Sequence, residues 1–313
     1  MLNGNRVLAE AGPGVYTIDA AYVRPGLAAV HLVVDGGEAA FVDTAVAPSV
    51  PRFLDGLAEA GLAPADVRWV LVTHVHLDHA GGAGELMRRL PHAELVAHPR
   101  GAPHLIDPEK LVAGTKATYG EAVYNKLYGE IPPVDAARVR TVADGEVLPL
   151  GGRDLEFIHT PGHALHHYCI VDGAHRLVFS GDTFGVSYRE FDTADGAFIF
   201  PTTTPTHFDP EQAHASIDRI VGYAPEAVYL THYSRVTEVS RLAADLHAEL
   251  DAFVEMAHHE PALPALTTAL TAHLRKRLRA HGCVLPVRVQ DELLALDAGL
   301  NAKGLLAWRQ RTG

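Results

Sequence analysis

Three histidines and an aspartate lie within six residues of one another in the first third of the chain. They are His74, His76, Asp78 and His79. The chain has 20 histidines, so a lone histidine would mean little, but four ligand-type side chains this close together indicate a metal site. Imidazole and carboxylate ligands without thiolate suit zinc, iron or manganese. Coordination positions left open by the protein would suit catalysis.

The residues around this group predict a loop between a strand and a helix. Residues 68–72 are apolar and partly β-branched, as in a buried strand, and residues 85–90 have the character of a helix. Side chains two apart point the same way in an extended segment, so His74 and His76 can bind one ion together. The other two ligand-type residues follow after the chain has begun to turn, and they can face a second ion.

Residues 74–79 resemble the metal-binding signature of the metallo-β-lactamase superfamily. Three later segments are similar to other elements of that family: a Pro-Gly-His turn at 161–163, a Gly-Asp element at 181–182, and a last histidine at 232. Each comes soon after a predicted strand. The resemblance covers about residues 14–235 and fills all seven ligand positions of the family.

This resemblance implies an α/β (α+β) fold, namely an αββα sandwich with its metal site at one edge. It also implies two divalent metal ions, with zinc as the first choice and iron or manganese as alternatives. The residues assigned to the first ion are His74, His76 and His163, those assigned to the second are Asp78, His79 and His232, and Asp182 bridges the two. Asp78 and Asp182 bring negative charge to this centre and are the candidate catalytic residues.

Four further residues are candidates for supporting roles. In the resembling family an aspartate at the position of Asp43 supports the metal site from behind, although the sequence alone would equally allow a turn cap. Many members carry a histidine at the position of His167, which is a second supporting candidate. The segment 183–209 is long and irregular, and long loops beside metal sites are often functional. Within it, Tyr188 and His207 are candidate substrate contacts.

The chain divides into two predicted regions, a metallo-β-lactamase-like catalytic domain at 1–236 and an all-helical C-terminal region at 237–313. Leucines at helical spacing predict two long helices in the C-terminal region. Two shorter helices are expected after them, at 287–297 and 300–310.

Residues 108–130 predict a helical insertion that carries Tyr119, Tyr124 and Tyr128. Two interpretations are open. In the resembling hydrolases an insertion at this point often overhangs the active site, whereas aromatic residues at helical spacing more often pack on the core. The second interpretation is favoured.

The predicted function is that of a glyoxalase II-like, metal-dependent hydrolase, because the turns at 159–163 and 180–182 resemble that branch. A metal-bound hydroxide would cleave a small-molecule thioester, ester or lactone. The alternative is a persulfide dioxygenase-type oxidoreductase with a single iron, and the filled second metal site argues against it. A phosphodiesterase or nuclease is a weaker alternative. Asp78, Asp182 and the helical tail disfavour β-lactam cleavage.

Charge and composition limit the classes of partner that the chain can bind. The 38 acidic residues outnumber the 26 lysines and arginines and give a formal net charge of −12. This balance argues against a nucleic-acid partner, because phosphate binding requires a basic surface. No run reaches the ~18 apolar residues of a spanning helix, so no membrane partner is expected. The two cysteines show no disulfide pattern, which fits a reducing cytoplasm. A homodimer is left open.

Overall fold

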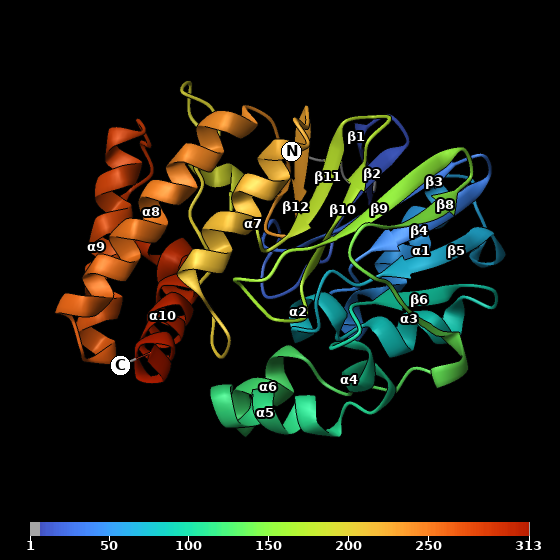
Figure 1. Cartoon of the computed structure of the whole chain (residues 1–313), viewed down its shortest axis with the longest axis horizontal. Coiled ribbons are helices and arrows are strands. Elements are labelled where there is room, and N and C mark those ends of the chain that lie inside the picture. The colour runs from blue at the N-terminus through green and yellow to red at the C-terminus, as the bar shows by residue number, and fades with distance from the viewer. Residues whose placement is uncertain (1–6, 313) are drawn as a thin grey trace.

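The computed structural model describes residues 7–312, whose strands form two β-sheets (Figure 1). The first sheet follows the order of the chain: β1 (Leu8–Gly12), β2 (Val15–Asp19), β3 (Ala29–Asp35), β4 (Glu38–Val42), β5 (Val67–Leu71), β6 (Glu94–Ala97) and β7 (Val139–Thr141). The second has the spatial order β13-β12-β11-β10-β9-β8: β8 (Glu146–Leu150), β9 (Arg153–His159), β10 (Tyr168–Asp172), β11 (Leu177–Gly181), β12 (Ala227–Leu230) and β13 (Ser234–Val236). The consecutive strands β3 and β4, and likewise β10 and β11, pair antiparallel as hairpins.

Helices cover the outer face of each sheet. The helices α1 (Val50–Glu59) and α3 (Ala83–Arg89) pack on the first sheet, and α7 (Pro210–Gly222) packs on the second. Side chains alternate along the strands, so Val33 and Phe157 join the apolar core between the sheets while Leu32 joins the core under the helices. The αββα sandwich expected from the sequence is therefore confirmed.

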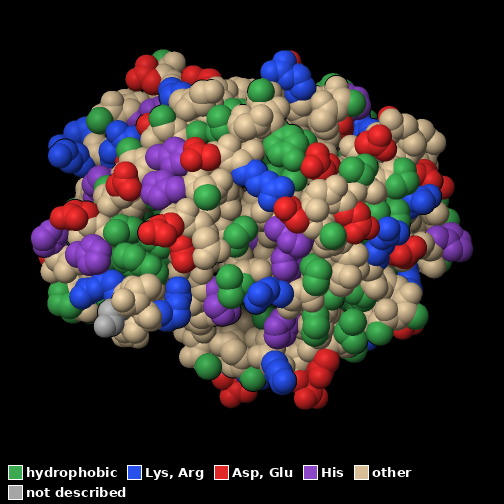
Figure 2. Space-filling view, in the orientation of Figure 1, with side chains coloured by type: hydrophobic (Ala, Val, Ile, Leu, Met, Phe, Trp, Pro, Cys, Tyr) green, Lys and Arg blue, Asp and Glu red, His purple; other side chains and the backbone are tan. Residues whose placement is uncertain are grey.

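Short helices lie near the ends of the strands, and long ones follow the sandwich. The short helices are α2 (Leu77–Ala80), α4 (Ala102–Ile106), α5 (Glu109–Tyr119) and α6 (Glu121–Leu127). The long helices are α8 (Val239–His259), α9 (Leu263–Ala280) and α10 (Val287–Thr312). None of the helices within residues 7–312 is long and apolar enough to cross a membrane. On the face in Figure 2, basic and acidic side chains are interspersed over the surface.

The C-terminal helical region differs from the prediction in one respect. The prediction of two short helices at 287–297 and 300–310 is wrong, because α10 runs without a break through Gly299. A glycine inside a helix costs only about 1 kcal/mol relative to alanine. Packing of α10 against α9 and α8 outweighs that cost. Helix propensity is a local property of the sequence, so it could not predict this packing between helices.

Contacts with the loop before α7 hold α10 beside the sandwich. Asn301 accepts a hydrogen bond from the Thr203 N–H at 2.7 Å and donates one to the Pro201 carbonyl at 3.1 Å. Gly304 permits this close approach, since a Cβ at this position would lie 1.4 Å from the Thr203 carbonyl oxygen. The middle of α10 consequently lies where it can line a cavity next to the strand ends.

Candidate active site

The ligand-type side chains meet at one edge of the sandwich, beyond the ends of several strands. The loop after β5 carries two of them and α2 carries two more, while the segments after β9, β11 and β12 supply the rest. The structure thus brings together all seven residues that the sequence predicted. Three groups have ligand atoms within 4.8 Å of one another: His74, His76 and His163; His74, His79 and Asp182; and Asp78, His79 and His232.

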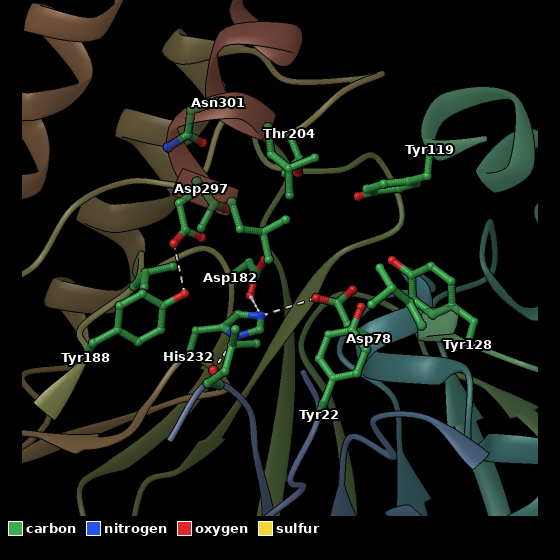
Figure 3. Close-up of a pocket in the computed structure, with 16 residues that line it drawn as sticks. Tyr22, Asp78, Tyr119, Tyr128, Asp182, Tyr188, Thr204, His232, Asp297 and Asn301 are labelled. Carbon is green, nitrogen blue, oxygen red and sulfur yellow. Dashed lines mark hydrogen bonds and ion pairs between the residues drawn. The ribbon is translucent and has the colours of Figure 1, made fainter. Parts of the chain in front are cut away.

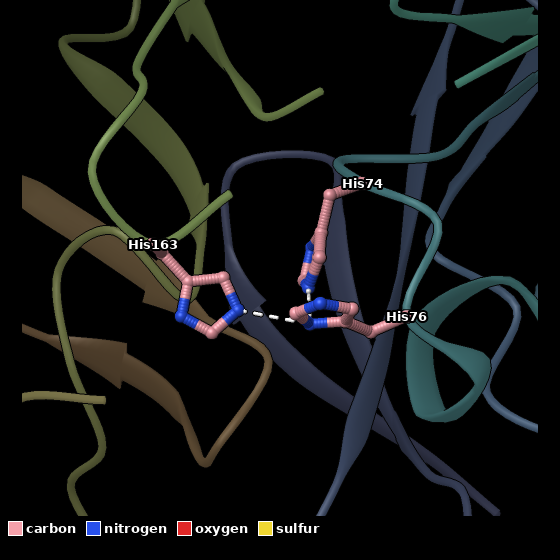
Figure 4. A group of neighbouring side chains, drawn as sticks. All are labelled: His74, His76 and His163. Carbon is pink, nitrogen blue, oxygen red and sulfur yellow. Dashed lines mark hydrogen bonds between the residues drawn. The ribbon is translucent and has the colours of Figure 1, made fainter. Parts of the chain in front are cut away.

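The first group consists of three imidazoles around one point (Figure 4). His76 Nδ1 lies 2.8 Å from His74 Nε2 and 3.0 Å from His163 Nε2. Burial lowers the pKa of His74 and of His76 well below the ordinary value, and neighbouring imidazoles add to this effect. The outer nitrogens of His74 and His163 have hydroxyl neighbours in Thr73 and Thr202. Neutral rings oriented in this way direct their inner lone pairs toward one another, and a cation between them would stabilise the arrangement.

The other two groups share His79 and have one carboxylate each, Asp182 in one and Asp78 in the other, and both carboxylates lie beside His232 (Figure 3). His232 Nε2 lies 3.4 Å from Asp78 Oδ2 and 3.7 Å from Asp182 Oδ1. Burial lowers the pKa of His232, but the two carboxylates outweigh burial and raise that pKa to about 9. Asp182 Oδ2 lies 3.5 Å from His163 Nε2, so this carboxylate also faces the first group. The two buried carboxylates are stabilised by positive charge at this point, which a proton or a metal ion can supply.

Two buried atoms test whether a metal ion fits. His79 Nδ1 donates to Asp43 Oδ2 at 2.8 Å, so Nε2 is the nitrogen that faces the site. Burial lowers the pKa of His79, but Asp182, Asp43 and Asp78 outweigh burial and raise that pKa well above its ordinary value. This Nε2 lies 3.2 Å from Asp182 Oδ1, and neither atom has a hydrogen-bond partner within residues 7–312. An unprotonated Nε2 and a carboxylate oxygen this close would repel each other, so a proton or a metal ion must supply positive charge between them. The residues therefore fit a divalent cation, and their nitrogen and oxygen donors suit zinc, iron or manganese.

Asp43 lies behind the ligands and is fully buried. Besides the His79 bond, its carboxylate accepts bonds from the Thr73 N–H at 2.8 Å, the Thr73 hydroxyl at 2.9 Å and the Thr231 hydroxyl at 2.7 Å. Its φ of +64° is left-handed, a conformation that aspartate adopts more readily than most residues. Asp43 thus fixes which nitrogen of His79 carries the proton and joins the ends of β4, β5 and β12.

His167 contacts the other side of the site. Its Nε2 accepts a hydrogen bond from the Asp182 N–H at 3.2 Å, and its Nδ1 lies 2.9 Å from the Thr160 hydroxyl. Burial lowers the pKa of His167 well below the ordinary value, so the ring is neutral and can accept at Nε2. The sequence left His166 without a role, and the structure stacks its ring on that of His74, with the centroids 6.2 Å apart.

A cavity with two connected lobes opens over the ligand residues. Asp78, Asp182, Tyr119 and Tyr128 line both lobes. The inner lobe extends to α10, and further residues that line it are Tyr22, Leu27, Tyr188, Leu296, Asp297 and Leu300 (Figure 3). The outer lobe extends along α5, and further residues that line it are His104, Lys110, Thr115, Thr118, His166 and His207.

The tyrosines of the insertion serve both the cavity and the core. Tyr119 and Tyr128 line the cavity beside Asp78, as the overhanging interpretation expects, and Tyr128 also belongs to the apolar core, as the favoured interpretation expects. Tyr124 is buried and lines neither lobe. Helical spacing shows which side chains share a face, but it does not show whether that face meets the core or a cavity.

The structure also places the two candidate substrate contacts. Tyr188 is buried in the wall of the inner lobe, and His207 is exposed at the outer lobe. Sequence reasoning missed Asp297 because it lies more than 60 residues beyond the last ligand, in a separately predicted region. The one local signal was a carboxylate between Leu296 and Leu300 on an otherwise apolar helical face.

The family model of the metallo-beta-lactamase superfamily matches residues 23–232, which include all seven ligand-type residues. The chain belongs to this superfamily. Its members are generally metal-dependent hydrolases, and the cluster of histidines and aspartates fits a metal site.

Relatives within the superfamily include thioester hydrolases. A hydroxyacylglutathione hydrolase from Acidiphilium cryptum is 31% identical over 267 residues, which cover 84% of this chain and 82% of the relative. An acyl-coenzyme A thioesterase from Gallus gallus is 31% identical over 184 residues, which cover 55% of this chain and 63% of the relative. A solved archaeal superfamily protein from Sulfolobus tokodaii superposes with a TM-score of 0.67 at 22% identity, covering 94% of this chain and 98% of the other. This last likeness supports the fold alone.

Proposed function

We propose that this protein is a dinuclear metal-dependent hydrolase that cleaves an acyl thioester. The observation that carries the proposal is the buried, convergent set of imidazole and carboxylate acceptors at the floor of a cavity. The thioester substrate is supported by the two relatives named as a hydroxyacylglutathione hydrolase and an acyl-coenzyme A thioesterase. Zinc is the first choice of metal, with iron or manganese as alternatives.

The side chains around the ligands hold each donor atom in the state that metal binding requires. Divalent ions bound here would supply a water nucleophile at neutral pH and polarise the scissile carbonyl. Asp43 accepts from His79 Nδ1, and the Leu27 carbonyl accepts from His232 Nδ1 at 2.7 Å, so in both rings Nε2 is the nitrogen that would bind a metal ion in place of a proton. His167 Nε2 accepts a hydrogen bond from the backbone N–H of Asp182 and so holds this residue in place.

The two lobes would bind the two parts of a thioester. The inner lobe has mainly leucine and tyrosine walls, which suit an acyl chain and exclude water from the reacting carbonyl. The outer lobe carries Lys110, His207 and several threonines, which suit the polar part of a thiol leaving group. The scissile bond would then lie over Asp78 and Asp182, which line both lobes.

The test is hydrolysis of a panel of acyl thioesters of glutathione and coenzyme A, measured by the thiol released. Lactones and simple esters complete the panel. His232→Ala and Asp182→Ala should each lower kcat/KM by at least about a hundredfold, since each removes a ligand and leaves a charged partner unpaired. His92→Ala is the matched control, because His92 is exposed and lines neither lobe. Full turnover by Asp182→Ala, or a metal-loaded protein inert to every thioester, would contradict the proposal.

A further inference from the structure

The inner lobe contains a carboxylate that the proposed hydrolysis does not use. Asp297 lies on α10 and lines the same lobe as Asp182 and His232 (Figure 3). It belongs to none of the groups that could hold a metal ion within the described chain. The Asn301 and Gly304 contacts with the loop at 201–204 fix the helix that carries it, so the position of Asp297 is set by the fold.

Within residues 7–312, one oxygen of this carboxylate has a hydrogen-bond partner and the other has none. Tyr188 Oη donates to Asp297 Oδ2 at 3.0 Å, and Tyr188 is itself buried with 1% of its surface exposed. The nearby guanidinium of Arg24 lies 4.6 Å from the centroid of the Tyr188 ring but pairs with Glu190 at 2.6 Å. Tyr188 therefore holds Asp297 in one orientation and leaves Oδ1 able to accept a bond from a ligand.

Two other polar side chains of the lobe, those of Asn301 and Thr202, already have partners in the protein. Asn301 uses its oxygen to bind Thr203 and its nitrogen to bind Pro201. The Thr202 hydroxyl lies 2.5 Å from His163 Nδ1. Burial raises the pKa of Asp297 to about 6, with His232 and the Tyr188 bond acting in the opposite direction. The carboxylate is consequently ionised at neutral pH, at a cost that a purely apolar wall would avoid.

We propose that Asp297 sets substrate specificity by accepting a hydrogen bond from a donor group on the acyl chain, remote from the scissile carbonyl. This inference rests on the proposed thioester hydrolysis. The donor is a hydroxyl or an ammonium group, since both are bound by a carboxylate oxygen. An acyl chain that ends in a carboxylate would be repelled, because two like charges would share a lobe with little access to water.

The test is a series of acyl thioesters of four to eight carbons whose far end is unsubstituted or carries a hydroxyl, ammonium or carboxylate group. The wild-type protein should prefer the best donor-bearing chain over its unsubstituted analogue by about ten- to a hundredfold in kcat/KM. Asp297→Leu should abolish the preference. Asp297→Asn keeps an acceptor but loses the charge, so it should keep a preference for hydroxyl, lose one for ammonium and tolerate the carboxylate better.

The matched control is Glu292→Gln, which neutralises an exposed carboxylate on the same helix. It should leave every ratio of kcat/KM unchanged. If thioesters are hydrolysed but Asp297→Leu keeps the wild-type ratios, or if the wild type shows no preference for donors, the assignment of Asp297 is overturned while the hydrolase proposal stands. If the metal-loaded wild type hydrolyses no thioester, both proposals fail.

Discussion

Replacing Asp43 with asparagine tests whether the site depends on the protonation of a single ligand. Asparagine has the same shape and tolerates the left-handed φ of +64°. Its oxygen can still accept from Thr73, but its NH₂ group would replace the oxygen that accepts from His79 Nδ1 and from the Thr231 hydroxyl. Two donors would then face each other across 2.8 Å, unless His79 moves its proton to Nε2. That shift would put a hydrogen where the ligand lone pair should be.

The expected effect is a selective loss of metal affinity. Loss of an outer partner of a ligating histidine typically lowers affinity ten- to a hundredfold, which corresponds to about 1.4–2.7 kcal/mol. The metal affinity of the site that His79 helps to form should show this loss. Asp43 does not contact the group of His74, His76 and His163 directly, so the metal affinity of that group should change by no more than a few-fold.

Competition titration resolves these affinities. Metal-free protein is titrated with zinc against a chromophoric chelator, and the two dissociation constants are fitted for the wild type and Asp43→Asn. Asp297→Asn serves as a control, because it removes a charge near the site without touching a ligand. Wild-type affinity at both sites of Asp43→Asn would refute the reasoning, and equal weakening of both sites would point to general distortion instead.

Three further outcomes follow from the packing and charge of the site. Gly304→Ala should lower the free energy of unfolding by more than about 2 kcal/mol, because its Cβ would meet the Thr203 carbonyl. Gly299→Ala has open space around it and should raise the free energy of unfolding by about 0.5–1 kcal/mol. Denaturant melts measure both changes, and equal effects of the two variants would contradict the contact. The pKa of Asp297 is raised from 3.8 to about 6, so its contribution to stability is full below pH 4 and is lost as the pH rises through 6. Asp297→Asn should therefore gain about 3 kcal/mol over the wild type between pH 4 and pH 7, and a pH-independent difference would exclude this. Zinc at 1,000 times its dissociation constant should stabilise the metal-free protein by about 4 kcal/mol, seen as a higher thermal midpoint, and His232→Ala should gain less; an unchanged midpoint of the wild type would argue against a metal site in the folded state.

The first four ligand-type residues could be predicted from local spacing, and the three later ones from the resemblance to the superfamily. His74, His76, Asp78 and His79 lie in one short stretch, and each later ligand comes soon after a strand that alternation or apolar runs reveal. Ends of neighbouring strands meet at one edge of a sandwich, so spacing in the sequence translates into proximity. The αββα sandwich itself was implied by the resemblance to the superfamily.

The rest depended on contacts between distant segments. Gly299 appeared to be a break, yet packing on α8 and α9 carries α10 through it. The choice between core and cavity for Tyr119 and Tyr128 depends on where the insertion lies relative to Asp78, which no local pattern encodes. Asp297 reaches the inner lobe only because Asn301 and the loop before α7 meet.

The most direct test of the account is metal content and thioester turnover measured on the same preparation, purified without added metal. The account predicts close to two ions per chain, hydrolysis of an acyl thioester that a chelator abolishes, and recovery of both when zinc is restored. A chain that holds a single iron and consumes oxygen with a persulfide, or one that holds two ions and hydrolyses no thioester, would contradict it.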